Sequence, residues 1–192
     1  MGSPERGSGR VIVIILAGGR GERFTASGGG THKLDAPLGG KPVLAHVLEA
    51  VRRSGLHPWL VRPAGGTAGM GESIAMGVQA TPDAAGWLIL PGDLPLVRAE
   101  TINRVAAALA RRAIVVPTYQ GRPGHPVGFT RECFAALAQL DGDEGAKAVV
   151  QAYRRASGVH ELAVDDPGIV LDIDSLDDLH AAELRLAASG RA

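Results

Sequence analysis

The fold is decided by Val11-Ile12-Val13-Ile14-Ile15-Leu16, which is followed directly by Ala17-Gly18-Gly19-Arg20-Gly21-Glu22-Arg23. A continuous β-branched run closed by glycines is typical of a parallel strand that is buried on both faces. Because glycines lack Cβ atoms, their backbone N–H groups can approach an anion closely, and the two arginines add positive charge. The stretch therefore predicts a buried first strand and a loop that is either an anion site or merely a tight turn.

Strands and helices alternate along the rest of the chain. Further strands are predicted at about 57–61, 87–90, 113–117, 127–129, 161–164 and 169–171, and helices at about 42–54, 72–80, 99–111, 131–140, 145–156 and 176–188. Ser175 is the expected N-cap of the last helix, and Asp178 follows three residues later in a capping-box arrangement. The alternation predicts an α/β protein with a doubly wound, mainly parallel sheet, in a single domain over residues 10–192.

The composition limits the class of protein. Lys plus Arg and Asp plus Glu both number 20 in 192 residues, so no broad basic face for nucleic acid is expected. Cys133 is the only cysteine, which excludes an intramolecular disulfide and suits a reducing cytoplasm. The longest apolar run is too short to span a bilayer, and residues 1–9 read as a flexible leader or tag. We expect a cytoplasmic protein that binds neither nucleic acid nor membrane.

Polar clusters follow three of the predicted strands, at the edge where open α/β sheets bind ligands. They are the glycine loop, Pro91-Gly92-Asp93 and Asp172-Ile173-Asp174. A carboxylate held at the sheet edge, such as that of Asp93, suits Mg²⁺, although it could instead cap the next turn. Asp172 and Asp174 would share one face of a strand and could complete a metal site, whereas Asp174 could also cap the last helix.

Competing motifs are absent or incomplete. There is no G-x-x-x-x-G-K-[ST], so the glycine loop is not a P-loop, and Phe24 stands where a dinucleotide fingerprint needs Gly or Ala. Lys33 adds a mobile positive charge near the loop. His125, in the constrained Gly124-His125-Pro126 segment, is predicted to make a functional contact, whereas His46 is expected to be structural. Cys133 is expected to be a packing residue.

Six segments, taken in order, resemble the nucleotidyltransferases of molybdenum-cofactor maturation, specifically the molybdenum cofactor cytidylyltransferases. They are residues 16–24 with 33–34, then 69–77, 90–97, 124–129, 142–146 and 169–178. The first is similar to the family's triphosphate-binding signature, the second to a nucleotide-contact motif and the third to a metal-binding motif. The resemblance, which covers about residues 11–184, implies a Rossmann-like nucleotidyltransferase fold.

The resemblance also implies a reaction and a set of roles. CMP would pass from CTP to molybdenum-bound molybdopterin with release of pyrophosphate, in the presence of Mg²⁺ or alternatively Mn²⁺, and the product would pass through transient contact with a molybdenum hydroxylase or its chaperone. The implied catalytic residues are Arg23, Lys33 and Asp93, and the implied metal ligands are Asp93, Asp174 and Asp172. His125 and Pro126 would contact the acceptor. The nucleotide would be bound by Leu16, Ala17, Gly18, Gly19, Gly21, Arg23, Lys33, Gly71, Ser73 and Gly77.

Two departures keep alternatives open. Ala17-Gly18-Gly19 stands where the cytidylyl branch usually has Ala-Ala-Gly, and this form is typical of the related guanylyltransferases, so GTP is the alternative nucleotide. Residues 25–32 look like an insertion before Lys33. A sugar-phosphate or isoprenoid nucleotidyltransferase is a second alternative, and a catalytically silent cofactor-binding chaperone for molybdenum hydroxylases is a third. An NAD(P)-binding domain is disfavoured by the incomplete fingerprint.

Overall fold

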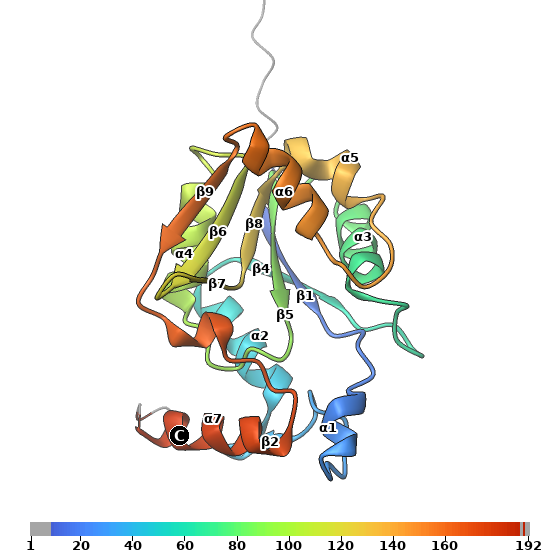
Figure 1. The fold of residues 1–192 in the computed structure, drawn as a ribbon, viewed down its shortest axis with the longest axis vertical. Coiled ribbons are helices and arrows are strands. Elements are labelled where there is room, and N and C mark those ends of the chain that lie inside the picture. The colour runs from blue at the N-terminus through green and yellow to red at the C-terminus, as the bar shows by residue number, and fades with distance from the viewer. Residues whose placement is uncertain (1–8, 189, 191–192) are drawn as a thin grey trace, which may run out of the picture.

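The computed structural model describes residues 9–188 and 190, so the expected leader lies outside the described residues except for Gly9. A mixed sheet forms the centre of the molecule (Figure 1). Its strand order is β4 (His57–Val61), β1 (Val11–Leu16), β5 (Gly86–Pro91), β8 (Val127–Thr130), β6 (Ile114–Tyr119) and β7 (Arg122–Pro123), and β9 (Val159–Ala163) also pairs with β6.

The sheet is mostly parallel. Strand β1 runs parallel to both β4 and β5, and β6 runs parallel to β9. Strand β8 is antiparallel to β5 and β6 on either side of it, and β7 is antiparallel to β6. Strands β4, β1, β5, β6 and β9 therefore share one direction, which confirms the predicted α/β class with a mainly parallel sheet.

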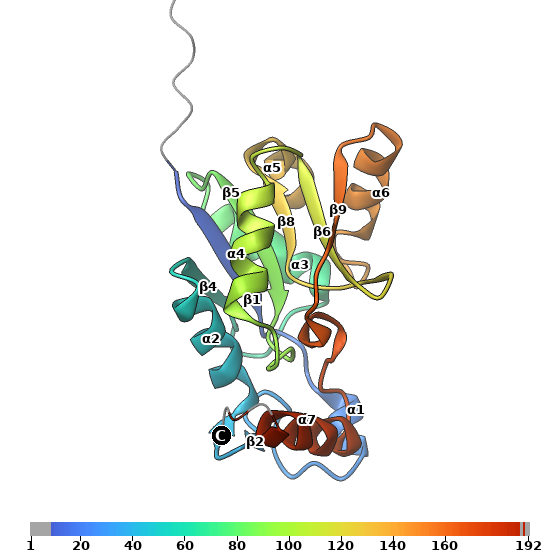
Figure 2. The same cartoon turned by 90° about the vertical axis from the view of Figure 1, so that its left-hand side faces the viewer.

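Helices cover both faces of the sheet (Figures 1 and 2). On one face lie α2 (Val43–Arg53) and α4 (Ala99–Ala108), and on the other lie α3 (Met70–Ala80), α5 (Phe134–Leu137) and α6 (Lys147–Arg155). Successive side chains of β1 alternate between the two layers: Val13 and Ile15 belong to the core under α2 and α4, whereas Ile14 and Leu16 belong to the core under α3. A strand buried on both faces explains its continuous apolar run.

A smaller layer lies beyond the carboxyl ends of the parallel strands (Figures 1 and 2). It contains α1 (Glu22–Ala26), the two-stranded sheet of β2 (Pro37–Leu38) with β3 (Lys41–Pro42), and α7 (Leu176–Ala188). The predicted N-cap of α7 is confirmed, because Asp178 N–H donates to Ser175 Oγ at 3.2 Å. The Asp178 carboxylate accepts from the Ser175 hydroxyl at 2.7 Å and from Asp174 N–H at 3.1 Å, so its backbone partner is residue 174 and not the Ser175 N–H that a capping box uses. The Leu176 N–H donates to Ser27 Oγ at 3.1 Å and ties α7 to the segment after α1.

The strand predicted at 169–171 is wrong, since this segment forms the 3-10 helix η2 (Pro167–Val170). Pro167 has no N–H for a sheet ladder, and the Asp166 carboxylate accepts from Gly168 N–H at 3.0 Å, which favours a helical turn. The same carboxylate accepts from the Arg98 N–H and the Thr101 hydroxyl. Ile169 packs into the core, which accounts for the apolar pattern of this segment. Asp172 and Asp174 therefore follow a turn rather than a strand.

Other differences from the sequence expectations are smaller. The predicted helix at 131–140 is the 3-10 turn η1 (Arg131–Cys133) followed by the short α5, and the expected loop up to residue 41 contains α1, β2 and β3. Cys133 is buried in the core, as expected. No helix within the described part of the chain has both the length and the apolar character that a bilayer crossing requires.

Gly77 provides a test of how α3 packs on the sheet. A methyl group at Gly77 would lie 2.6 Å from Ile14 Cγ2, and Ile14 is fully buried. We expect Gly77→Ala to lower the free energy of unfolding by about 1–3 kcal/mol, measured by urea denaturation, because the core must shift to admit the methyl group. The exposed neighbour Met76 supplies the control, and Met76→Ala should change it by less than about 0.5 kcal/mol. Equal stability of the two variants would contradict this packing role.

Candidate active site

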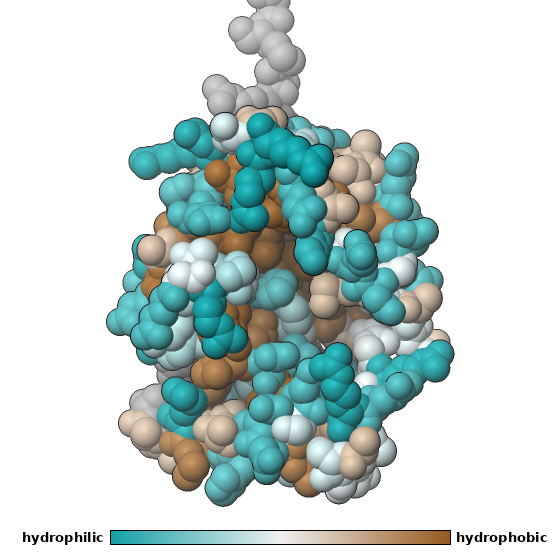
Figure 3. All heavy atoms as spheres, in the orientation of Figure 1, coloured by the Kyte–Doolittle hydropathy of each residue, from teal (hydrophilic) through white to brown (hydrophobic). Residues whose placement is uncertain are grey.

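A cavity of about 860 Å³ opens where the carboxyl ends of β1 and β5 meet the smaller layer. Hydrophilic residues surround the hollowed face of the molecule, and hydrophobic residues are visible deeper in it (Figure 3). The cavity is lined by Leu16, Ala17, Gly18, Gly19, Arg20, Gly21, Glu22, Arg23, Phe24, Lys33, Leu34, Thr67, Ala68, Gly69, Met70, Ser73, Pro91, Asp93, Asp143, Asp172 and Asp174. Most of the residues predicted for the phosphates and the metal therefore border one space.

The glycine loop presents free backbone donors to this cavity. The N–H groups of residues 18–23 have no acceptor among the described residues. Gly21 adopts φ of 68°, a left-handed conformation that glycine reaches without steric cost, and a Cβ at Gly19 would meet nothing within 4 Å. Unpaired N–H groups on an open glycine backbone suit phosphate oxygens. Of the two alternatives left open by the sequence, the geometry favours an anion site over a tight turn alone.

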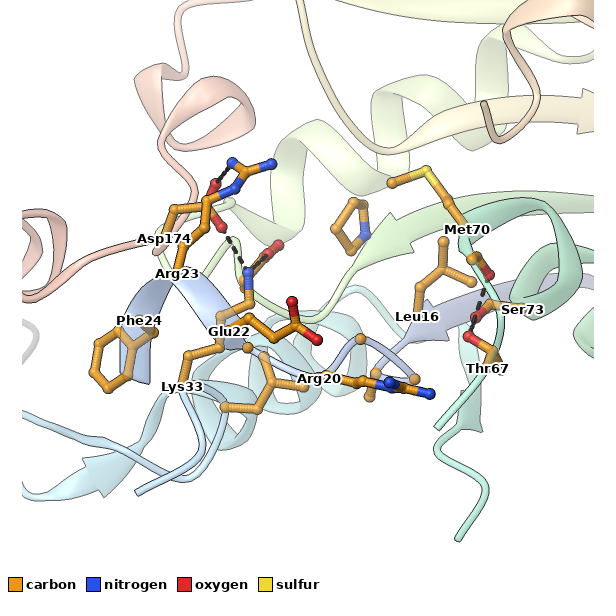
Figure 4. Close-up of a pocket in the computed structure, with 18 of the residues that line it drawn as sticks. Leu16, Arg20, Glu22, Arg23, Phe24, Lys33, Thr67, Met70, Ser73 and Asp174 are labelled. Carbon is orange, nitrogen blue, oxygen red and sulfur yellow. Dashed lines mark hydrogen bonds and ion pairs between the residues drawn. The ribbon is translucent and has the colours of Figure 1, made fainter. Parts of the chain in front are cut away.

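Opposite charges meet at the other end of the cavity (Figure 4). The Lys33 ammonium lies 2.7 Å from Asp93 Oδ2 and 2.8 Å from Asp174 Oδ1, so a single cation bridges both carboxylates. Arg23 Nη1 lies 2.6 Å from Asp174 Oδ2. The Lys33 and Asp93 side chains are 14% and 18% exposed, whereas that of Arg23 is 82% exposed and can leave the pair with little loss of packing.

Charge pairing determines the protonation of this cluster. Burial alone would lower the pKa of Lys33, but the Asp93 and Asp174 carboxylates outweigh it and hold that pKa above its ordinary value. Hydrogen bonds from Lys33, with a smaller contribution from Arg23, hold the pKa of Asp174 below its ordinary value. The pairing therefore favours the charged forms of Lys33 and Asp174, and both cations of the cluster contact carboxylate oxygens that another cation could also bind.

The backbone explains how Asp93 and Asp174 come together. Gly92 N–H donates to Leu16 O at 2.8 Å, which fixes the turn carrying Asp93 against the end of β1. Ile173 N–H donates to Asp93 O at 3.0 Å, which holds the segment between Asp172 and Asp174 beside the same turn. The three sequence-distant clusters thus meet through hydrogen bonds, even though the last of them follows no strand.

The donor set fits a divalent cation held jointly with a ligand. Asp93 Oδ1 is buried and has no hydrogen-bond partner among the described residues, and Asp93 Oδ2 and Asp174 Oδ1 already converge on a single positive group. Mg²⁺ commonly takes one or two carboxylates together with substrate phosphates. Within the described part of the chain, no three acidic, His or Cys side chains are close enough to form a complete metal site. Asp172 borders the cavity but is not brought into the pair.

The wall opposite this cluster carries hydroxyl groups (Figure 4). Thr67 Oγ1 and Ser73 Oγ lie 2.7 Å apart, and Thr67 N–H donates to Gly18 O at 3.1 Å. A methyl group at Gly18 would lie 2.7 Å from Thr67 Oγ1 and 3.0 Å from Ser73 Oγ. Gly18 is therefore required by close packing against Thr67.

Two glycines predicted to contact the nucleotide lie outside the cavity. Gly71 N–H donates to Gly142 O at 2.8 Å, and a Cβ at Gly71 would lie 2.1 Å from Asp141 O. This close approach brings the neighbouring Asp143 to the cavity wall. Gly77 packs on Ile14, as described above. Both glycines support the wall from behind, and direct contact with a nucleotide stays a prediction for them.

His125 and Pro126 also do not line the cavity. The His125 N–H donates to Ile169 O at 3.0 Å, so this loop supports the segment that leads to Asp172. Burial lowers the pKa of His125 to about 4, and the Asp172 carboxylate only partly opposes this, so the imidazole is neutral at pH 7. His46 is structural, with its Nε2 2.8 Å from Leu38 O. Contact of His125 and Pro126 with an acceptor molecule stays a prediction.

Sequence reasoning missed several lining residues. Thr67 and Ala68 follow the carboxyl end of β4, and this position was the available signal, because β4 is a parallel neighbour of β1. Met70 lies in the segment 69–77 that resembles a nucleotide-contact motif, but it was not singled out. Arg20 was predicted only to add positive charge to the glycine loop, and Glu22 lies in the same loop without a predicted role. Asp143 lies in a segment quoted for its resemblance and could have been found only from that motif.

Comparison with known proteins identifies a matching family model. The model of the MobA-like NTP transferase domain matches residues 13–65 and 58–157. Bifunctional protein GlmU of Stenotrophomonas maltophilia (strain K279a) is 33% identical over 157 residues, which are 70% of this chain and 32% of that protein. The chain thus spans about a third of the length of the curated relatives that it matches.

Solved structures share the fold over nearly the whole chain. Rv0371c from Mycobacterium tuberculosis H37Rv superimposes with a TM-score of 0.77 at 27% identity, covering 92% of this chain and 99% of that one. Its structure in complex with manganese gives 0.68 at 24% identity, covering 92% and 98%. Molybdopterin-guanine dinucleotide biosynthesis protein A from Archaeoglobus fulgidus gives 0.61 at 17% identity, covering 92% and 99%.

Lys33 allows a test of the carboxylate pair. We expect Lys33→Met to strengthen binding of Mn²⁺ in the absence of nucleotide by about tenfold, because it removes the ammonium that competes for Asp93 and Asp174. Electron paramagnetic resonance of free Mn²⁺ in a titration measures the affinity directly. Lys41→Met, which removes an exposed lysine paired with Glu49, is the matched control. Unchanged or weaker Mn²⁺ binding by Lys33→Met would rule out this pair as the cation site.

Proposed function

The chain belongs to the family of MobA-like NTP transferase domains, and we propose that it transfers CMP from CTP to molybdenum-bound molybdopterin with release of pyrophosphate. One observation carries the proposal: a loop of unpaired backbone N–H groups and the ion-paired Lys33–Asp93–Asp174 cluster border the same cavity. The first can bind a triphosphate and the second can hold a cation beside it. The acceptor is proposed because six segments, in the same order along the chain, resemble those of the molybdenum-cofactor enzymes.

Phosphate binding would rearrange the ion pairs of the cluster. The N–H groups of the glycine loop would donate to the phosphate oxygens, because they have no other acceptor among the described residues. Arg23 would leave Asp174 for the β- and γ-phosphates, and its exposed side chain supports such a movement. Lys33 would turn from the carboxylates to the oxygens of the α-phosphate. The triphosphate therefore replaces the carboxylates as the partner of both cations.

The transfer itself would be an in-line displacement. A terminal phosphate oxygen of the acceptor forms a bond to the α-phosphorus, and the bond between the α-phosphorus and the bridging oxygen to the β-phosphate breaks. Pyrophosphate leaves with the electron pair of that bond. No protein base is needed, since the attacking phosphate is already ionised near neutral pH. The work of the protein is to position the reactants and to stabilise charge with Lys33 and Arg23.

Asp93 and Asp174 are the residues that would hold a divalent ion together with the phosphates. When bound, Mg²⁺ or Mn²⁺ would neutralise the negative charge that develops on the reacting phosphates. The unpartnered Asp93 Oδ1 supports this role, and a structure of the similar Rv0371c contains manganese. Asp172 borders the cavity and is proposed as an additional ligand through water or after rearrangement.

GTP is the second candidate nucleotide. It is favoured by the Ala17-Gly18-Gly19 form of the loop. The likeness to a molybdopterin-guanine dinucleotide protein, at 17% identity, supports the fold and not the choice of base. The close packing of Gly18 against Thr67 explains the presence of a glycine at this position without reference to the base. For this reason the proposal keeps CTP, which the later motifs of the resemblance favour.

Asp93 is the residue whose loss should abolish the reaction. We expect Asp93→Asn to reduce the rate of pyrophosphate release by at least about 100-fold, because the variant loses a charged cation ligand while it keeps the shape of the side chain. A coupled pyrophosphate assay with molybdopterin and each nucleoside triphosphate measures the rate. Asp83→Asn, an exposed aspartate before β5, is the control and should leave the rate unchanged. Near-normal turnover of folded Asp93→Asn would remove Asp93 from the mechanism.

The choice of base has its own test. The ratio of kcat/KM for CTP and GTP should favour CTP by at least about tenfold, a difference that base-specific hydrogen bonds commonly supply. Gly18→Ala should weaken both nucleotides to a similar extent, because its methyl group collides with Thr67 and distorts the shared wall. A clear preference of the native protein for GTP would overturn the cytidylyl assignment, and a switch of preference in Gly18→Ala would show that Gly18 reads the base.

A further inference from the structure

His32 lies behind the glycine loop and is not among the residues that line the cavity. Its Nε2 is 2.8 Å from Gly19 O, and its Nδ1 accepts from Leu34 N–H at 3.2 Å. Its carbonyl oxygen accepts from the Asp35 and Ala36 N–H groups at 2.9 and 3.1 Å. One residue therefore connects the glycine loop to the turn that carries Lys33.

The hydrogen bonds fix the protonation of the ring. A backbone N–H can only donate, so Nδ1 must be the acceptor from Leu34 and cannot carry a proton. A backbone carbonyl can only accept, so the ring proton must be on Nε2 and points to Gly19 O. His32 therefore uses Nδ1 to order the turn and Nε2 to hold the loop.

Holding the Gly19 carbonyl has a consequence for the loop. In a trans peptide the C=O and the following N–H point to opposite sides, so turning the Gly19 carbonyl toward His32 turns the Arg20 N–H away from it. Arg20 borders the cavity, and its N–H has no acceptor among the described residues. The ring also packs on Gly21, where a Cβ would lie 3.5 Å from His32 Cδ2. The ring thus contacts the loop at two of its glycines without lining the cavity itself.

We propose that His32 is a positioning residue for triphosphate binding. It holds the Gly19 carbonyl back, so that the N–H groups of the glycine loop face the phosphates, and it links this loop to the turn from which Lys33 reaches Asp93 and Asp174 (Figure 4). The bond to Gly19 O is the part that sets phosphate affinity, and the bond to Leu34 orders the turn. The inference rests on the proposed function, since it assumes that the loop binds a triphosphate.

The two ring bonds can be separated by substitution. The side-chain amide nitrogen of Gln can replace Nε2 as the donor to Gly19 O, whereas the side-chain oxygen of Asn can replace Nδ1 as the acceptor from the N–H two residues later. His32→Gln therefore keeps the bond to the loop, His32→Asn keeps the bond to the turn, and His32→Ala removes both. His57→Ala, on an exposed histidine at the start of β4, is the matched control.

The experiment measures binding by isothermal titration calorimetry, with inorganic tripolyphosphate in the presence of EDTA and with Mg²⁺–CTP and Mg²⁺–GTP. Thermal unfolding of each variant shows that it is folded. We expect His32→Ala and His32→Asn to bind tripolyphosphate about tenfold more weakly than the native protein, and His32→Gln to stay within about threefold of it. In turnover with CTP, KM should rise in His32→Asn while kcat changes less, because the phosphates are held less well but the chemistry is intact.

The outcomes separate this inference from the proposed function. If the native protein binds the triphosphates and His32→Asn binds them equally well, His32 has no positioning role while the proposed function stands. If His32→Gln is as weak as His32→Ala, the bond to Gly19 O does not set the affinity, and the inference also fails. If the native protein binds neither nucleotide nor tripolyphosphate, the proposed function fails and the inference fails with it.

Discussion

The bridge from the Lys33 ammonium to the Asp93 and Asp174 carboxylates is the interaction on which the cavity depends. It joins segments 60 and 141 residues away from Lys33 in the sequence. The two carboxylates approach the same ammonium group, which offsets the repulsion between them. They in turn hold the pKa of Lys33 above its ordinary value. The bridge therefore gathers one positive and two negative side chains at the place where a cation and an anion would enter together.

Strand topology supplies the frame for this bridge, and hydrogen bonds between loops complete it. Strands β1, β4 and β5 end at the same edge because they are parallel, so the glycine loop, the Thr67 segment and Asp93 meet there. Asp174 arrives by another route, through the turn that Asp166 anchors and the bond from Ile173 to Asp93 O. Segments that approach from two layers can change their separation without breaking the sheet. Such a junction suits a site that exchanges Lys33 for another cation.

The sequence predicted the parts of this arrangement that depend on local pattern. Strands such as 11–16 and 57–61 and the Ser175 N-cap are encoded by neighbouring residues, and they agree with the structure. The strand at 169–171 was mispredicted because a short run of apolar residues that packs into the core can form either a strand or a 3-10 turn. Pro167, which cannot donate to a sheet ladder, favours the turn. Gly71 and Gly77 show a second limit. Some glycines of a motif face a ligand, and others allow another segment of the same chain to pack closely. Only the packing in the structure distinguishes the two kinds.

Gly18 shows how the difficulty of telling ligand-binding glycines from packing glycines affects the prediction of function. Considered as part of the sequence motif alone, Gly18 favours the guanylyltransferases over the cytidylyltransferases. In the folded chain its Cα lies so close to Thr67 that a methyl group would meet the hydroxyl at 2.7 Å, and that hydroxyl is itself bonded to Ser73. Residues 18 and 67 therefore constrain each other, and this contact gives Gly18 a packing role apart from any contact with the base. Base preference in this chain must be sought in side chains that face the open cavity, among which Met70 and Asp143 lie on the same side as the hydroxyl pair.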